Sequence, residues 1–323
     1  MNRPALTKIL FLHEMHDVII TGVREAAPEA NVVVAKDAAE VDREIVDATV
    51  VIGGNITDEQ VEAANDLVWH HVPWVGVESI IRPAIQEKGI ILTNGSGVNS
   101  ENIAEHVVAM MLMFARDLHS FVRHQDKHEW RKWEEDAPQF FELGSQRVLC
   151  LGTGDIGQEV AKRLAGFGCE IIGASRSGRE IPGFDRCVSF DNLNEELALA
   201  DHVVSSLPMT PSTDKIVGRE QIQAMKPGAY FHNVGRGGTV DQDALIEALK
   251  SGHLAGAGLD VVSPEPLPDD SPLWDMKNVI ISSHTSGNSP KAVERMGELA
   301  VAQIKRYQAG EPLLNLVDLS SGY

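Results

Sequence analysis

The sequence predicts an α/β protein of two doubly wound domains, each with helices on both faces of a parallel sheet. Three observations support this fold class. Short apolar runs alternate with helical stretches along the chain, as βα units require. The 323 residues suffice for two domains that each bury a core. A glycine-rich turn follows the apolar run 147–152, whereas residues 1–93 show no turn of that pattern.

The first domain is predicted from five apolar runs with helical stretches between them. Apolar runs of this length are typical of strands buried on both faces, as in a parallel sheet. Thr57 is expected to begin one of the helices, because Gln60 follows it at capping-box spacing. The five expected strands are residues 8–12, 31–35, 49–53, 68–72 and 89–93.

Two long helices define the expected domain boundaries. One is predicted from Ser100 to Arg123, after a hinge-like turn at 94–97. The other runs from Pro290 to Ala309 and should return the chain to the first domain. We therefore expect one domain of residues 1–96 with 289–323 and another of residues 97–288. The apolar face of the first helix comprises Ile103, Val107, Met110, Met111, Phe114 and Leu118.

Residues 128–133 are basic and aromatic within an acidic chain. They are interpreted either as an arm that packs on a partner subunit or as a segment whose tryptophan lines a substrate pocket.

Residues 147–177 read as strand, glycine turn, helix and strand. In a G-x-G-x-x-G turn, Gly152 allows the tight turn, Gly154 lets the backbone approach a pyrophosphate, and Gly157 lets helix pack on strand. The N–H groups that begin the helix then hold the anion. In this context the motif predicts dinucleotide binding rather than a purely structural turn. The expected cofactor contacts here are Gly152, Gly154, Asp155, Ile156 and Gly157.

The end of the second strand of this unit indicates which dinucleotide binds. An NAD-binding unit usually carries Asp or Glu there, for the ribose 2′-hydroxyl. This chain has Ser175, Arg176 and Ser177 instead. Arg176 can pair with a 2′-phosphate and the two serines can donate to it. The sequence thus favours NADP(H) over NAD(H), the alternative being a solvated surface arginine.

The amino-acid composition limits which partners the protein can bind and indicates its cellular compartment. The formal net charge of −19 disfavours nucleic acid and anionic membranes as partners. The three cysteines lack metal-like spacing and fit unreactive thiols in a reducing compartment, so we expect a cytoplasmic protein without a metal site. The N-terminus has no signal-peptide pattern, and no apolar run approaches the length of a membrane span.

Later in the chain, candidate catalytic residues follow strand ends. Strands are expected at 201–207, 229–234, 256–260 and 278–283. Open α/β sheets bind ligands at the carboxyl ends of their strands, and Arg236, Glu265 and His284 each lie just past such an end. The cofactor contacts expected from these loops are Leu207, Pro208, Thr213, Val234, Arg236, Asp260 and His284.

These three side chains suit hydride transfer to a carbonyl. A histidine titrates near neutral pH, so His284 can supply the proton. Glu265 can hydrogen-bond the imidazole and fix its tautomer. Arg236 can bind a carboxylate bidentately and polarise an adjacent ketone. The alternatives are a surface arginine, a turn carboxylate between prolines and a loop-capping histidine.

The chain resembles the D-isomer-specific 2-hydroxyacid dehydrogenase family over nearly its full length. The matching segments are Gly152–Gly157, Asn233–Gly237, Gly258–Pro266, Ser283–His284 with Gly287, and Ile103–His106, which matches the helix that begins the nucleotide domain.

The resemblance implies a flavodoxin-like substrate (catalytic) domain and a Rossmann nucleotide-binding domain with a cleft between them, the latter formed by residues 97–288. It implies a catalytic Arg, Glu and His at Arg236, Glu265 and His284. The substrate would also contact Trp74, whose loop supplies the backbone N–H groups of Val75 and Gly76. The resemblance further implies a homodimer joined through the nucleotide-binding domains.

Three departures from the family pattern stand out. Ser283 replaces the usual proline before the histidine, which predicts a less rigid loop. Trp74 replaces a small residue and should reshape the substrate pocket. Ser175 replaces a common aspartate, in line with NADP(H). The chain also lacks the C-terminal extension of the long phosphoglycerate dehydrogenases, which makes that role less favoured.

The sequence therefore predicts an NADP-preferring 2-keto acid reductase that works reversibly on D-2-hydroxy acids. In reduction, hydride reaches C2 while His284 protonates the oxygen. Two alternatives stay open. One is a dehydrogenase of another small acid, such as formate or phosphite. The other is a dinucleotide-sensing binding protein of the same fold.

Overall fold

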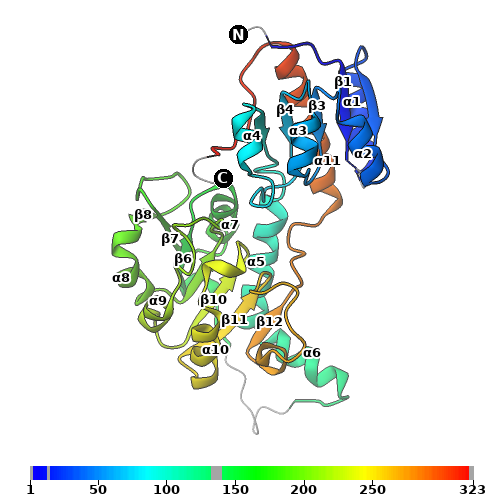
Figure 1. Ribbon diagram of the computed structural model, residues 1–323. Coiled ribbons are helices and arrows are strands. Elements are labelled where there is room, and N and C mark those ends of the chain that lie inside the picture. Colours follow the sequence, from blue (N-terminus) through cyan, green and yellow to red (C-terminus); the bar gives the residue numbers. More distant parts are fainter. Residues whose placement is uncertain (1–2, 13–14, 132–139, 320–323) are drawn as a thin grey trace. The chain divides into compact units, whose positions relative to one another are not determined.

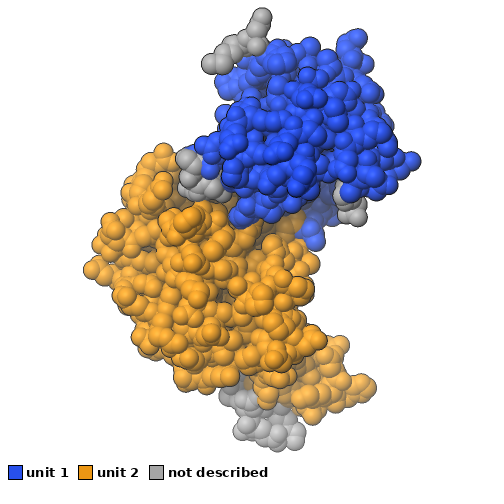
Figure 2. Space-filling model, viewed as in Figure 1, with its two compact units in different colours: residues 1–99, 288–323 blue, residues 100–287 orange. Residues whose placement is uncertain are grey.

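The computed structural model describes residues 3–12, 15–131 and 140–319. The chain divides into two compact units, residues 1–99 with 288–323 (unit 1) and residues 100–287 (unit 2), coloured separately in Figure 2. Each unit contains one parallel sheet with helices packed against it (Figure 1). The predicted α/β class with two doubly wound sheets is confirmed.

Unit 1 has a five-stranded sheet in the order β2-β1-β3-β4-β5. Its strands are β1 (Lys8–Phe11), β2 (Asn31–Val34), β3 (Val50–Ile52), β4 (Trp69–His71) and β5 (Ile91–Thr93). Its helices are α1 (Asp17–Ala26), α2 (Ala38–Glu44), α3 (Asp58–Ala63), α4 (Pro83–Glu87) and α11 (Pro290–Gln308). The predicted capping box of Thr57 and Gln60 is present at the start of α3.

The side chains of β1 alternate between the two faces of this sheet. Ile9 and Phe11 pack in the core beneath α1 and α11, whereas Leu10 packs in the core beneath α2, α3 and α4. All three are fully buried. The apolar run therefore belongs to a strand covered on both sides, as its composition predicts.

Helix α11 brings the end of the chain back to unit 1. It packs beside α1, where a Cβ at Gly22 would lie 3.0 Å from Val301. Ile304 is fully buried, and Tyr307 stacks on Trp69 of β4 with ring centroids 5.6 Å apart. The strands of residues 1–93 are thus completed by a helix almost two hundred residues away.

Unit 2 has a seven-stranded parallel sheet in the order β12-β11-β10-β9-β6-β7-β8. Its strands are β6 (Arg147–Leu151), β7 (Glu170–Ser175), β8 (Arg186–Ser189), β9 (His202–Ser205), β10 (Ala229–Asn233), β11 (Leu254–Leu259) and β12 (Val279–Ile281). Its helices are α5 (Ser100–Ala115), α6 (Leu118–Asp126), α7 (Asp155–Ala165), α8 (Leu193–Leu197), α9 (Arg219–Ala224) and α10 (Gln242–Ser251). Strand β8 is a short edge strand that the sequence reading did not identify.

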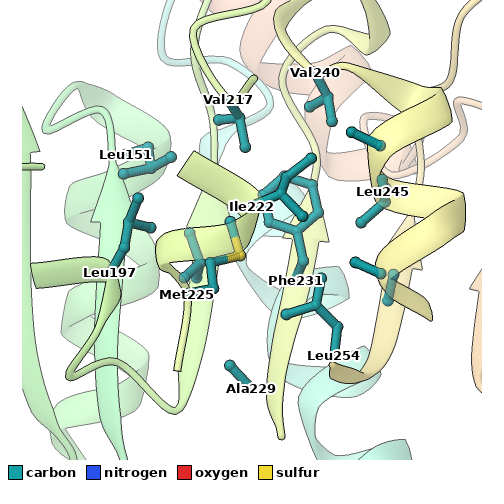
Figure 3. Packing of buried hydrophobic residues seen from close by; sticks show 14 of the residues in the cluster. Leu151, Leu197, Val217, Ile222, Met225, Ala229, Phe231, Val240, Leu245 and Leu254 are labelled. Carbon is teal, nitrogen blue, oxygen red and sulfur yellow. The ribbon is translucent and has the colours of Figure 1, made fainter. Parts of the chain in front are cut away.

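Two apolar clusters cover the faces of this sheet. Helices α5 and α7 pack on one face, and α8, α9 and α10 on the other. Figure 3 shows Phe231 of β10 among side chains from the covering helices, including Ile222 and Leu245. Phe231 is fully buried, and β10 lies between β11 and β9 inside the sheet.

The prediction of one helix from Ser100 to Arg123 is wrong. Helix α5 ends at Ala115, and α6 begins after Asp117, whose φ of 52° is left-handed and breaks the helical hydrogen-bond ladder. The Asp117 carboxylate accepts a hydrogen bond from Arg131, which fixes this turn. Leu118, assigned to the apolar face, is consequently 47% exposed.

The arm predicted at residues 128–133 is described only in part. Trp130 is 94% exposed. Lys132 and Trp133 lie outside the described residues, so neither interpretation of their side chains is tested.

Four of the histidines that the structure describes are fully buried within the sheets: His70 and His71 of β4, His202 of β9 and His232 of β10. Burial lowers the pKa of His70 to about 4 and the pKa values of His71 and His202 to about 3. Burial, and next the neighbouring His202, also hold the pKa of His232 well below 6.5. Each imidazole is therefore neutral in the folded protein but takes up a proton on unfolding below about pH 6.5.

We predict that the free energy of unfolding decreases as the pH falls from 6.5 towards 3, because the unfolded chain binds more protons. Each such histidine contributes up to about 1.4 kcal/mol per pH unit in that window. Urea unfolding between pH 7.5 and 4.5 measures the slope. His202→Phe, which keeps a ring against Tyr230, should give a shallower slope, and exposed His16→Phe the wild-type slope. Equal slopes for wild type and His202→Phe would contradict this assignment.

Candidate active site

The glycine turn lies between β6 and α7, as predicted. Gly152 has a φ of 104°, which a side chain would strain, and a Cβ there would lie 2.8 Å from Ser206 Oγ. A Cβ at Gly157 would lie 2.1 Å from the Gly152 carbonyl oxygen, so the helix can approach the strand only without one. At Gly154, by contrast, an added Cβ meets nothing within 4 Å.

This arrangement fits a dinucleotide. Two glycines close the turn on itself, while Gly154 leaves open space beside the start of α7. The first N–H groups of a helix have no partner within the helix, and here they belong to Asp155, Ile156 and Gly157. Such groups bind phosphate oxygens.

The end of β7 presents the residues expected to select the cofactor. Ser175 Oγ accepts a hydrogen bond from Gly178 N (3.2 Å), and Ser177 Oγ accepts one from Arg179 N (3.3 Å). Both serines therefore help to close the turn. Arg176 is exposed, and its guanidinium makes no hydrogen bond or ion pair with the described residues. It is a cation available to a ligand.

The sheet order places the candidate residues in a row along one edge. All neighbouring strands are parallel, so their carboxyl ends meet at the same edge. From β12 to β7 this edge carries His284, the loop with Asp260 and Glu265, Arg236, Leu207, the glycine turn and Arg176.

Arg236 is held in a loop flanked by glycines. A Cβ at Gly235 would lie 2.5 Å from the Leu207 carbonyl oxygen, and a Cβ at Gly237 would lie 1.8 Å from that of Val262. The Arg236 carbonyl oxygen also accepts hydrogen bonds from Asn233 Nδ2 (3.1 Å) and Thr239 Oγ1 (2.7 Å). The backbone beneath the guanidinium is thus fixed from both neighbouring loops.

Glu265 and His284 are brought together. Glu265 Oε2 lies 2.8 Å from His284 Nδ1, and Glu265 Oε1 accepts a hydrogen bond from Val262 N (3.1 Å). A carboxylate only accepts, so the imidazole donates from Nδ1. Its Nε2 makes no hydrogen bond with the described residues. The Val262 carbonyl also lies against Gly237 in the Arg236 loop. The three predicted catalytic residues therefore lie on three loops that follow β10, β11 and β12, and each loop contacts the next.

Asp260 and Thr213 are engaged in ways that the sequence did not indicate. The Asp260 carboxylate accepts hydrogen bonds from Ser282 Oγ (2.8 Å) and Thr285 N (2.9 Å) as well as from Ser286. The Thr213 hydroxyl donates to the Pro208 carbonyl oxygen (2.6 Å) and accepts from Thr210 N (2.8 Å). Both side chains thus stabilise loops at the sheet edge. Leu207 and Val234 are buried beneath them. The cofactor contacts expected of these residues stay predictions.

The predicted substrate loop belongs to unit 1, where it follows β4. Trp74 is 40% exposed, and its indole lies 3.1 Å from the position of a Cβ at Gly54. Asn94 Nδ2 donates to the Val75 carbonyl oxygen (2.9 Å), which holds the loop against the end of β5. Within unit 1 the large indole is accommodated because residue 54 has no side chain. The substrate contacts of Trp74, Val75 and Gly76 stay predictions.

Comparison with known families decides the affiliation of the chain. Residues 108–286 match the model of the D-isomer specific 2-hydroxyacid dehydrogenase, NAD binding domain. The chain belongs to this dehydrogenase family. The predicted membership is thereby confirmed, and the matched region contains the glycine turn and all three candidate catalytic residues.

Several relatives cover most of the chain. A glyoxylate reductase of Korarchaeum cryptofilum is 33% identical over 76% of this chain and 74% of its own. A D-3-phosphoglycerate dehydrogenase of Methanocaldococcus jannaschii is 34% identical over 97% of this chain, which spans 60% of that enzyme's length. An NADPH-dependent glyoxylate/hydroxypyruvate reductase of Sinorhizobium meliloti, solved with NADP and sulfate, is 27% identical with a TM-score of 0.85, covering 98% of this chain and 100% of that one.

Across the described ranges, no helix is long and apolar enough to span a membrane. The same residues contain no group of three or more His, Cys, Asp or Glu side chains arranged to hold a metal ion.

We predict that replacing Gly157 reduces stability, whereas replacing Gly154 reduces dinucleotide binding. Gly157→Ala should destabilise the protein by roughly 1–3 kcal/mol, because its Cβ collides with backbone. Gly154→Ala should leave stability near wild type yet weaken dinucleotide binding, because its methyl group occupies the space left for phosphate. Thermal unfolding and fluorescence titration with NADPH separate the two effects. Equal stability losses in both variants would refute this division of roles.

Proposed function

We propose that this protein is an NAD(P)-dependent 2-keto acid reductase and D-2-hydroxyacid dehydrogenase that prefers NADP(H). The observation that carries the proposal is the 2.8 Å contact between His284 Nδ1 and Glu265 Oε2, at the sheet edge that also holds the glycine turn. Membership of the dehydrogenase family supports the reaction class. The glyoxylate and hydroxypyruvate reductases among its relatives support a small 2-keto acid as substrate.

In this mechanism, each side chain has a separate task. A bound nicotinamide cofactor supplies the hydride that reaches C2 of the keto acid. Glu265 fixes the imidazole through Nδ1, so His284 in its protonated form donates from Nε2 to the carbonyl oxygen. In the reverse direction the neutral Nε2 takes the proton from the hydroxyl. Arg236 binds the substrate carboxylate and stabilises the charge that develops on the oxygen.

The preference for NADP(H) rests on the end of β7. Ser175 stands where an acidic side chain would hold the ribose 2′-hydroxyl of NAD. The guanidinium of Arg176 is exposed and makes no hydrogen bond or ion pair with the described residues, which supports its pairing with a 2′-phosphate instead. A carboxylate at this position would repel that phosphate, whereas a hydroxyl does not.

We further propose a cytoplasmic homodimer joined through unit 2. Leu118 and Val122 are exposed one helical turn apart on α6, and Trp130 follows them, which gives this unit an apolar surface suited to a second copy. All three cysteines are free and buried, which suits a reducing compartment.

We expect His284→Asn to lower kcat by about 10²–10⁴-fold, because the proton donor is lost, while affinity for NADPH stays near that of wild type. The assay follows NADPH consumption with a panel of 2-keto acids that includes glyoxylate and hydroxypyruvate. His128→Asn, at an exposed left-handed position that Asn tolerates, is the control and should retain activity.

The same assay separates the alternatives. Tight NADPH binding with no turnover of any 2-keto acid would indicate a dinucleotide sensor rather than a reductase. Oxidation of formate or phosphite, without reduction of any 2-keto acid, would indicate a dehydrogenase of another small acid.

The cofactor preference has its own test. Arg176→Ala should raise the KM for NADPH by about ten- to a hundredfold, since a hydrogen bond to a charged group contributes roughly 1.5–3 kcal/mol. The KM for NADH should change little, because that cofactor lacks the phosphate. Arg179→Ala removes a second exposed arginine of the same loop and serves as the matched control. An unchanged KM for NADPH in Arg176→Ala would refute the contact between Arg176 and the 2′-phosphate, and with it the basis for the NADP(H) assignment.

A further inference from the structure

The Asp260 carboxylate accepts hydrogen bonds from residues on both sides of His284. Its side chain is 1% exposed. Oδ1 accepts hydrogen bonds from Ser282 Oγ (2.8 Å), Thr285 N (2.9 Å) and Ser286 N (3.2 Å), and Oδ2 accepts from Ser286 Oγ. Every one of these donors lies within two residues of His284. The carboxylate therefore fixes the loop on both sides of the proposed proton donor.

The backbone of His284 needs this support. Its φ of 52° lies in the left-handed region, which only a few per cent of non-glycine residues adopt. Its N–H donates to the Asp260 carbonyl oxygen (2.8 Å). Such a conformation persists only where surrounding contacts determine it.

Helix α5 attaches to this loop at two points. His106 Nε2 lies 2.7 Å from Ser282 Oγ, and Asn102 Nδ2 donates to the Ser286 carbonyl oxygen (2.7 Å). His106 and Asn102 are four residues apart and so share one face of the helix. Unit 2 begins at Ser100 and ends at Gly287, so both attachments lie close to where the chain enters and leaves the unit.

The direction of the hydrogen bonds follows from the carboxylate. Asp260 only accepts, so the Ser282 hydroxyl directs its proton to Oδ1. Its oxygen must then accept from His106, whose Nε2 carries a hydrogen. Without that donor, Ser282 Oγ keeps only its bond to Asp260, and this contact weakens together with the loop that it holds.

We propose that His106 is a positioning residue, which acts through Ser282 and Asp260 to hold the His284 loop in its working conformation. The inference rests on the proposed function, because it treats His284 as the proton donor. His106 touches neither substrate nor cofactor in this role.

The experiment compares His106→Leu and Ser282→Ala in the full-length protein, with NADPH and a 2-keto acid that the wild type reduces. His106→Leu removes the hydrogen bond to Ser282, and Ser282→Ala removes both that bond and the one to Asp260. Each change should lower kcat by about tenfold or more, while the Kd for NADPH is unchanged. His106→Gln restores a donor at the same reach and should recover most of the kcat. The double variant should lose no more than Ser282→Ala alone, because that change already breaks the connection that His106→Leu removes.

Hydrogen exchange tests the loop without relying on turnover. The amides of Thr285 and Ser286 should exchange about tenfold faster in His106→Leu and Ser282→Ala, because their acceptor is less fixed. Ser283→Ala is the matched control, since the exposed Ser283 side chain makes no hydrogen bond with the described residues, and it should exchange as wild type does.

Three results would overturn the inference: unchanged exchange at residues 285 and 286, a His106→Gln variant as slow as His106→Leu, or additive losses in the double variant. If His106→Leu unfolds, Ser282→Ala removes a single oxygen atom and carries the test. A wild type that reduces no 2-keto acid would refute the proposed function, while the exchange experiment still decides whether His106 holds the loop.

Discussion

Backbone contact between neighbouring loops is the constraint on which the edge of the unit 2 sheet depends. Gly157 reaches the carbonyl of Gly152, Gly235 that of Leu207, and Gly237 that of Val262, each closer than any Cβ would permit. The turn after β6 therefore closes on its own main chain, and the loop after β10 touches those after β9 and β11 through main chain, without intervening side chains. Main-chain contacts have little freedom to rearrange. Side chains on such loops are therefore held in fixed positions. A reaction between atoms a few ångströms apart requires this precision.

The charge of the chain makes this local geometry more important. A protein with a net charge of −19 repels an anionic dinucleotide at long range. Binding must then come from short-range groups at the sheet edge: the first N–H groups of α7 and the guanidinium of Arg176. Salt screens the repulsion between charges that lie more than about 8–10 Å apart, whereas hydrogen bonds at contact distance persist. Salt should therefore favour cofactor binding here, the reverse of what a basic protein would show.

Much of this edge was predictable because the relevant signals are local in sequence. The glycine spacing, and the positions of Arg236, Glu265 and His284 just past apolar runs, require only strand periodicity and the rule for parallel sheets. The break at Asp117 was not predictable, because the apolar spacing continues to Leu118 and the turn depends on distant Arg131. Strand β8 is short and lies at the sheet edge, so its sequence carries little apolar signal. The link from His106 to Ser282 spans 176 residues, and no spacing rule reveals it.

Ser283 stands before His284 where the family pattern has proline, and hydrogen bonds to Asp260 restrict the loop instead. Proline at this position would restrict the backbone covalently, by fixing φ near −65°. Ser283 imposes no such limit, and the sequence alone therefore suggested a looser loop. Here Asp260 supplies the restriction through hydrogen bonds to Ser282, Thr285 and Ser286, which flank the histidine. A covalent restriction acts in every state of the chain, whereas hydrogen bonds act only while their acceptor stays ionised and in place. The orientation of the proposed proton donor in this dehydrogenase thus depends on a buried carboxylate and on the helix that keeps it engaged.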